Sequence, residues 1–449
     1  MRRFRLLFFT LILTLGLFSA AVASETAPFE ERLYDGKTLF ECADASVTPA
    51  VKGYGAYVCN LDTGAVMYRK NADDMVYPAS TAKLMTAIVA YENIPDLQTV
   101  ITASASAVNA SKGSNMAIKV GESFTAEQLL NGLLITGAND AANVLAEYVG
   151  GSIDGFCELM NAKAKEIGAE HTTYANPTGL HDANMKTTTK DTAIVARYFY
   201  YINALFEMSN TTRYIVEKTP LTDRDRILLN RNLLISRVRS ENYYYSPAKG
   251  MSLGSTPEAG ECIVTCAEDK DGMTYLCVVM NAVASENEES AACADAAALL
   301  KACLENFSYT DVLTQRNNIC EIPVTLAVDT DYVTLLPESG MKALLPNTLD
   351  YAAEISIEPR VSEAHATAPV YEGQVYGEAV VKYRGETILG AVNLAASRDI
   401  DKSNVLYLLD RAERLVLGRW FRVFAISAAV LFVFYFGLSV AVQRGRRRR

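Results

Sequence analysis

Ser80 and Lys83 are the residues of this 449-residue sequence whose types and spacing could support catalysis. They lie at the start of a segment, Thr81–Tyr91, whose apolar residues recur with helical spacing. Because residues three apart share a helix face, the hydroxyl and the amine would be neighbours. A serine at a helix N-terminus can act as a nucleophile, and a lysine whose pKa is lowered by burial can accept its proton. The same pattern also fits a helix-capping serine beside an unrelated lysine.

Five stretches of the sequence together resemble the serine D-alanyl-D-alanine carboxypeptidases, also known as low-molecular-mass penicillin-binding proteins. The first stretch contains Ser80 and Lys83, and the second contains Asn139. The resemblance runs from about Gly53 to Ala282 and continues near the C-terminus. The five stretches are Pro78–Ala87, Leu133–Ala142, Asn176–Thr188, Thr256–Gly260 and Ala368–Gly377.

The resemblance implies roles for particular residues. Ser80 corresponds to the acylated nucleophile, Lys83 to its general base, and Asn139 to the asparagine that bonds the substrate peptide. The backbone N–H groups of Ser80 and Ser255 would form the oxyanion hole. The substrate-binding strand around the third family motif would contain Ser252, Gly254, Ser255 and Thr256.

Two motifs depart from the family pattern. The second motif normally reads Ser-x-Asn, and its serine position is Gly137 here. The third motif normally reads Lys-Thr-Gly, and the aligned residues are Ser252, Leu253 and Gly254. Lys249 lies three residues before Ser252, and an odd offset along a strand predicts that it points to the opposite face.

A hydroxyl of the proton relay and a cation for the substrate carboxylate are therefore missing from the expected positions. Losing a charged contact typically costs a few kcal/mol, so turnover could fall severely while acylation persists. We expect Ser252→Lys combined with Leu253→Thr to raise the acylation rate. An unchanged or slower rate would show that this strand is misaligned.

Three functions fit these residues. The first is a membrane-tethered, exported carboxypeptidase that removes the terminal D-Ala of the peptidoglycan pentapeptide through a Ser80 acyl-enzyme, with β-lactams as covalent inhibitors. The second is a catalytically impaired protein of the same fold that binds or scaffolds the cell wall, which Gly137 and the Ser252-Leu253 pair favour. The third is a β-lactamase, which shares the first motif but fits the C-terminal segments poorly. The resemblance favours the first.

The pattern of elements predicts an α+β fold. Helices packed on an antiparallel sheet would form a penicillin-binding or β-lactamase-like domain at 53–305, followed by a small all-β domain at 318–397. The predicted helices are Thr81–Tyr91, Ala126–Ile135, Ala141–Val149, Gly155–Ile167, Thr189–Phe206 and Ala291–Leu304. The predicted strands are Ala56–Asn60, Ala65–Arg69, Glu261–Thr265, Thr274–Met280, Pro323–Val328, Tyr332–Leu336, Ala353–Ile357, Gly377–Tyr383 and Ile388–Leu394.

The two ends of the chain predict export and membrane attachment. Residues 1–23 have the basic start, apolar run and Ala-Val-Ala ending of a signal peptide, although an uncleaved anchor fits too. A mixed lead occupies 24–52. An amphipathic stalk at 401–418 precedes an uncharged span at 423–442, which is long enough to cross a membrane. The basic tail at 443–449 predicts a single-pass protein with a cytoplasmic C-terminus and an extracytoplasmic body.

Composition excludes other classes of partner and cofactor. The net charge is −10, and eight of the 42 basic residues lie at the two ends, so the body is too acidic for a nucleic-acid-binding protein. The nine cysteines form no C-x-x-C pair and only three histidines occur, so neither a metal nor another cofactor is predicted. If Asp271-Gly272 forms a two-residue hairpin loop, Cys266 faces Cys277. We interpret these as buried thiols rather than as a disulfide.

Overall fold

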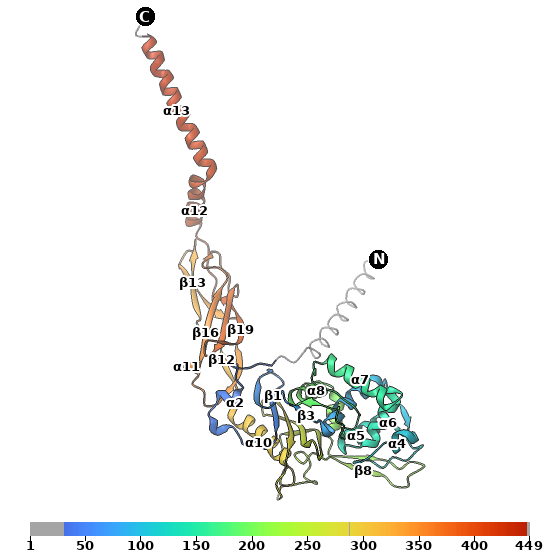
Figure 1. The fold of residues 1–449 in the computed structure, drawn as a ribbon. Coiled ribbons are helices and arrows are strands. Elements are labelled where there is room, and N and C mark those ends of the chain that lie inside the picture. Colours follow the sequence, from blue (N-terminus) through green and yellow to red (C-terminus); the bar gives the residue numbers. More distant parts are fainter. Residues whose placement is uncertain (1–30, 287, 447–449) are drawn as a thin grey trace. The chain divides into compact units, whose positions relative to one another are not determined.

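The computed structural model describes residues 31–286 and 288–446 (Figure 1). The predicted signal peptide at 1–23 lies outside the described residues, as do residues 24–30 of the lead and 447–449 of the basic tail. The described chain forms two compact units. The first extends to Tyr309 and includes Leu344–Leu349, and the second comprises Thr310–Ala343 and the chain from Asp350 onward.

The first unit is built on a five-stranded sheet with the order β2-β1-β11-β10-β9. Every neighbouring pair is antiparallel, so the predicted α+β class with an antiparallel sheet is confirmed. Strand β9 is an edge strand of this sheet and carries the residues aligned with the third motif. The strands are β1 (Gly55–Asn60), β2 (Val66–Lys70), β9 (Ala248–Thr256), β10 (Gly260–Glu268) and β11 (Thr274–Ala282).

Helices cover both faces of this sheet because both faces are apolar. In β1, Tyr57 and Cys59 belong to the large core cluster that contains the side chains of α3 and α8. Helix α10 packs on β10 and β11, outside that cluster. The helices of this unit are α2 (Leu39–Cys42), α3 (Ala82–Asn93), α4 (Ala105–Asn109), α5 (Ala126–Ile135), α6 (Asn139–Gly150), α7 (Ile153–Glu166), α8 (Thr189–Tyr201), α9 (Asn203–Asn210) and α10 (Ala291–Asn306), with short 3-10 turns η1 (Ala45–Val47) and η2 (Ala79–Thr81).

Local signals account for most helix boundaries. Helix α5 begins at a capping box in which the Thr125 hydroxyl accepts from the Gln128 N–H. Its predicted bounds are confirmed. The prediction of one helix over Thr189–Phe206 is wrong, because Ile202 (φ −88°, ψ 83°) leaves the helical conformation and separates α8 from α9.

The predicted pairing of Cys266 with Cys277 is also wrong by one residue. Cys266 pairs with Leu276, and Cys277 pairs with Thr265. The turn has three residues between Asp269 and Met273, since the Asp269 N–H donates to the Met273 carbonyl and Gly272 has φ +82°. Cys266 and Cys277 are buried free thiols in the structure, which agrees with this interpretation.

The first unit also contains three small antiparallel pairs of strands. One of them, the hairpin β7–β8, was not predicted from the sequence, and the Leu221 carbonyl in its loop accepts from Lys119 in the segment that follows α4. The pairs are β3 (Met75–Val76) with β6 (Thr187–Thr188), β4 (Val100–Thr102) with β5 (Ser123–Thr125), and β7 (Arg213–Val216) with β8 (Arg226–Leu229).

The second unit contains a six-stranded sheet with the order β16-β18-β19-β14-β13-β17, in agreement with the predicted all-β character. The strand predicted at Ala353–Ile357 begins two residues later, at Ile355, because Tyr351–Glu354 form one short helical turn. The elements are β13 (Cys320–Thr325), β14 (Tyr332–Pro337), α11 (Tyr351–Glu354), β16 (Ile355–Val361), β17 (Ala366–Thr367), β18 (Val375–Tyr383) and β19 (Thr387–Ala396), and β12 (Phe307–Leu313) pairs with β15 (Met341–Pro346).

The C-terminal end of the described chain is helical. Helix α12 (Asn404–Leu417) is amphipathic, and its cap Ser403 accepts from the Leu406 N–H. Helix α13 (Arg419–Arg446) follows. Within it, Arg419–Ala441 is long and apolar enough to cross a membrane, judged by length and composition.

Candidate active site

Ser80 lies in the short turn η2 that leads directly into α3. The preceding residue, Ala79, has φ +46°, an uncommon conformation for a residue with a side chain. Gly179 packs against this turn so closely that a Cβ there would lie 1.7 Å from the Ala79 carbonyl oxygen. Backbone strain and a close glycine contact therefore fix the direction in which Ser80 is presented.

Lys83 contacts Ser80 one helical turn away, as the spacing predicts. Its Nζ lies 3.0 Å from Ser80 Oγ and donates to the Thr178 carbonyl oxygen at 2.5 Å. Lys83 is 3% exposed. Burial, and to a smaller extent the positive charge of Arg231, lower the pKa of Lys83 to about 7. A large fraction of this amine is therefore neutral near pH 7 and able to accept a proton.

The loop that holds Lys83 is organised by Asn176. Its side-chain oxygen accepts from the backbone N–H groups of Thr178 and Gly179, and its amide donates to the Leu180 carbonyl. These bonds fix the orientation of the Thr178 carbonyl, which accepts from Lys83. This stretch is part of the family resemblance, but no role for it was predicted from the sequence.

Strand β9 passes directly beside the nucleophile. The Ser252 hydroxyl donates to the Ser80 carbonyl oxygen at 3.1 Å. A Cβ on Gly254 would lie 2.3 Å from Ser80 Cβ and 2.5 Å from Ser80 Oγ. Only a glycine permits this approach, so the aligned glycine of the third motif has a clear steric reason.

The remaining strand residues lie farther along β9. Ser255 lines a second cavity together with Gly254. The Thr256 hydroxyl accepts from the Ala259 N–H at 3.1 Å and thereby closes the turn between β9 and β10. Thr256 thus has a structural contact in addition to the substrate-binding role that the resemblance implies.

Asn139 begins α6 and is 4% exposed. Its amide Nδ2 donates to the Lys112 carbonyl oxygen at 2.5 Å, and within the described chain its Oδ1 has no hydrogen-bond partner. No hydrogen bond between described residues joins Asn139 to Ser80 or Lys83. The structure therefore brings Ser80, Lys83, Ser252 and Gly254 together, and holds Asn139 by the neighbouring loop.

The expected opposite orientation of Lys249 is wrong. Ser252 pairs with Val264 and Lys249 pairs with Cys266, because a β-bulge adds one residue to β9 between them. Val264 and Cys266 share a face, so the bulge cancels the odd offset and Lys249 is on the same face as Ser252. Lys249 nevertheless has no ion pair or side-chain hydrogen bond to Ser80 or Lys83 among the described contacts.

Arg231 is the cation that the structure places beside the cleft, and this position was not predicted from the sequence. It lines the cleft together with Ser80, Lys83 and Gly137. A Cβ on Gly137 would lie 3.1 Å from Arg231 Nη1. The only sequence signal is the Asn230-Arg231-Asn232 run, and a single arginine between two turn-forming residues indicates no particular chemistry.

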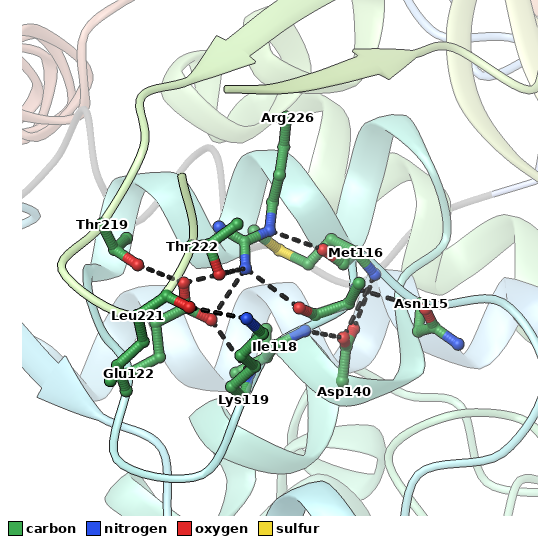
Figure 2. A network of polar contacts seen from close by, with 11 residues as sticks. Asn115, Met116, Ile118, Lys119, Glu122, Asp140, Thr219, Leu221, Thr222 and Arg226 are labelled. Carbon is green, nitrogen blue, oxygen red and sulfur yellow. Dashed lines mark hydrogen bonds and ion pairs between the residues drawn. The ribbon is translucent and has the colours of Figure 1, made fainter. Parts of the chain in front are cut away.

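A buried polar network supports this side of the cleft. Figure 2 shows that Arg226 of the β7–β8 hairpin pairs with Glu122 at 2.7 Å and donates to the Met116 carbonyl. In the same view Asp140 accepts from the N–H groups of Met116 and Ile118. The Asp140 carboxylate, in the first turn of α6, therefore anchors this loop.

The comparisons with known proteins agree with this arrangement. A family profile described as D-alanyl-D-alanine carboxypeptidase, peptidase S11, matches residues 43–284, more than half of the chain. The chain belongs to the D-alanyl-D-alanine carboxypeptidase family. This is a family of serine hydrolases, and the resemblance drawn from the motifs is confirmed.

Individual relatives extend the similarity over most of the chain. The D-alanyl-D-alanine carboxypeptidase DacF of Bacillus subtilis is 27% identical over 401 residues, which cover 88% of this chain and 95% of DacF. The fold is shared with penicillin binding protein 5 from Haemophilus influenzae, at a TM-score of 0.58 and 23% identity over 79% of this chain and 99% of that one. The D-alanyl-D-alanine carboxypeptidase DacD from Francisella tularensis gives a TM-score of 0.59 at 24% identity, and the match covers 79% of this chain and 95% of DacD.

Proposed function

We propose that this protein is a membrane-tethered serine carboxypeptidase that removes the terminal D-Ala from peptidoglycan stem pentapeptides. The observation that carries the proposal is the contact between Ser80 and a buried lysine whose pKa is lowered to about 7. Family membership and the similarity to DacF support the substrate class. Helix α13 supports attachment to a membrane, and the basic residues after it support a cytoplasmic C-terminus.

The first half of the reaction uses groups that already lie together. Neutral Lys83 accepts the Ser80 proton while Ser80 Oγ forms a bond to the carbonyl carbon of the penultimate D-Ala. The oxyanion that forms is held by the N–H groups of Ser80 and Ser255. The C–N bond then breaks, and Lys83 returns the proton to the leaving D-Ala amine.

The second half releases the shortened peptide. Water attacks the Ser80 ester with Lys83 as the base, and the proton returns to Ser80 Oγ as the ester breaks. A β-lactam acylates Ser80 by the same attack, but its amine stays attached to the acyl group. Penicillins therefore act as covalent inhibitors of this site.

The test is covalent labelling of the full-length protein in detergent with a fluorescent penicillin. We expect a mass increase on the Ser80 peptide that is absent from Ser80→Ala, and release of D-Ala from a pentapeptide by the unaltered protein. Lys83→Ala should lose the label as well, whereas Lys249→Ala should keep it. Absence of label on a folded protein would overturn the enzymatic proposal.

The second candidate is a protein that binds the cell wall without turnover. Gly137 and the Ser252-Leu253 pair favour it, since the expected hydroxyl and cation are missing from the second and third motifs. The two candidates give different results in the same experiment. Label without release of D-Ala, together with retained binding of pentapeptide, would support the binding protein.

A further inference from the structure

Arg231 carries a charge that no acidic side chain neutralises in the part of the chain that the structure describes. Its Nη1 donates to the Ser114 hydroxyl at 3.1 Å, and it forms no ion pair among the described residues. Glu261, which lines the adjoining cavity, is already bonded to the Ser290 hydroxyl and the Ala292 N–H. Half-buried arginines without a carboxylate partner are unusual, because desolvating a charge without compensation is costly.

The backbone around Arg231 is fixed in place. The Arg231 N–H donates to the Ile135 carbonyl at 3.1 Å, which ties the residue to the end of α5. On one side, the Asn230 amide donates to the carbonyls of Ser209 and Thr211. On the other, the Asn232 side-chain oxygen accepts from the Leu234 N–H. The backbone that carries Arg231 is therefore fixed, as the support of a binding residue should be.

The space for the guanidinium depends on the missing side chain at position 137. Gly137 has φ +66°, and a Cβ there would lie 3.1 Å from Arg231 Nη1 and 3.6 Å from Arg231 Cδ. A serine at this position would therefore press against the arginine. Gly137 therefore leaves room for the guanidinium in the position that it occupies.

Arg231 also lies between the nucleophile and the end of β9. It lines the cleft that contains Ser80 and Ser252, and it lines the adjoining cavity that contains Gly254 and Ser255. Arg239 is exposed at the same cavity and also lacks an ion pair among the described residues. The cavity lining thus contains two guanidiniums and two carboxylates, those of Glu261 and the exposed Glu289, and Arg231 is the cation that also reaches the cleft of Ser80.

We propose that Arg231 binds the terminal carboxylate of the peptide substrate and so replaces the cation that position 252 lacks, with Arg239 adding positive charge nearby. This inference rests on the proposed function, because it concerns the carboxylate of the same substrate. A guanidinium can bond both oxygens of a carboxylate, which gives orientation as well as affinity. The altered second and third motifs then belong to a binding site in which the cation for the substrate carboxylate is supplied from position 231 instead of position 252.

The test compares two peptides that differ only in this charge. The probes are diacetyl-L-Lys-D-Ala-D-Ala and its C-terminal amide, titrated calorimetrically into the full-length Ser80→Ala protein in detergent, which cannot form an acyl-enzyme. We expect the acid to bind roughly 10- to 100-fold more tightly than the amide. Adding Arg231→Gln should abolish this preference, and Arg231→Lys should keep part of it. Lys249→Ala is the matched control and should keep it fully.

Several results would overturn the inference. These are equal binding of acid and amide before Arg231 is changed, no binding of the acid, or an equal loss for both peptides in Arg231→Gln. Acylation of unaltered Ser80 by benzylpenicillin and by its methyl ester gives a second measurement, in which Arg231→Gln should slow the acid selectively. A preference for the acid that survives both Arg231→Gln and Arg239→Gln would also overturn the inference.

Failure of this inference can be told apart from failure of the proposed function. If the protein prefers the acid through Arg231 but is never labelled at Ser80, the carboxylate site is supported and the enzymatic role is contradicted. If the protein is labelled at Ser80 but shows no preference that depends on Arg231, the enzymatic role is supported and the inference about Arg231 is contradicted. In the Arg231→Gln background, Ser252→Lys should restore the preference, and failure to do so would contradict the replacement.

Discussion

At the scale of single residues, close packing around Ser80 leaves it little freedom. Gly179 abuts the backbone before Ser80, and Gly254 abuts its side chain. The hydroxyl is thereby held near Lys83 at 3.0 Å without any help from a substrate. Such preorganisation is what a nucleophile needs, because geometry lost by about 1 Å can cost a hundredfold in rate.

Gly254→Ala should slow acylation by at least about tenfold, because the added Cβ must displace Ser80. The rate of labelling with a fluorescent penicillin measures this effect. The control is Gly340→Ala, where the nearest atom to the added Cβ, the Leu313 carbonyl oxygen, is at an ordinary 3.4 Å. A parent-like rate in Gly254→Ala would show that Ser80 moves freely.

The acylation rate should depend on the protonation of Lys83. Since the base must be neutral and its pKa is lowered to about 7, the rate should rise about tenfold per pH unit below pH 7 and level off above it. Arg231→Gln removes a positive charge that lowers the pKa of Lys83, so the midpoint should move to higher pH. Stopped-flow acylation across about pH 5–9 measures both, and a flat profile would exclude Lys83 as the base.

At the scale of elements, the β7–β8 hairpin is tied to the segment before α5 by a buried ion pair. The side chain of Glu122 is 0% exposed and that of Arg226 is 10% exposed. Arg226 also donates to the carbonyls of Met116 and Ala117, and Asp140 holds the same segment from α6 (Figure 2). This network fixes the loop next to Asn139.

Arg226→Ala should lower the free energy of unfolding by about 3–5 kcal/mol, because it leaves the Glu122 carboxylate buried without its partner. Urea denaturation followed by circular dichroism measures the change. The matched control is Arg360→Ala, since Arg360 and Glu378 are 49% and 44% exposed and such pairs contribute at most about 1 kcal/mol. Equal losses in the two variants would show that the Glu122 pair is not special.

The sequence predicts the elements better than it predicts their alignment. Repeating apolar spacing places α5 correctly, and the motifs identify Ser80 and Lys83. The predicted pairing of Cys266 is wrong because the hairpin loop has three residues rather than two. The predicted orientation of Lys249 is wrong because a bulge adds one residue to β9. Both depend on single extra residues, which leave no periodic signal. Arg231 is missed because its position depends on residues distant in the sequence.

At the scale of the whole molecule, the segment proposed to attach the protein to a membrane and the residues proposed for catalysis lie in different parts of the chain. The proposed catalytic residues all belong to the first unit, and the apolar segment Arg419–Ala441 belongs to the second. No described residue of α13 is needed for the contacts around Ser80. Attachment and acylation should therefore be separable by truncation.

A chain that ends at Ser403 lacks α12 and α13 and should move from the membrane fraction to the soluble fraction while Ser80 still reacts with penicillin. Fractionation followed by labelling measures both properties. The control is removal of residues 447–449 alone, which leaves the apolar segment intact and should leave the protein in the membrane fraction. A truncated chain that stays with the membrane would place the attachment elsewhere.

The cysteine thiols buried in the core affect the conditions under which this protein can fold. Seven of the nine cysteines are buried, and none of these seven has a partner sulfur. In the finished protein the seven are shielded from oxidants, but in the unfolded chain every one is accessible. Mispaired sulfur would then prevent closure of the sheet, so refolding yield should depend on a reductant that the native protein no longer needs.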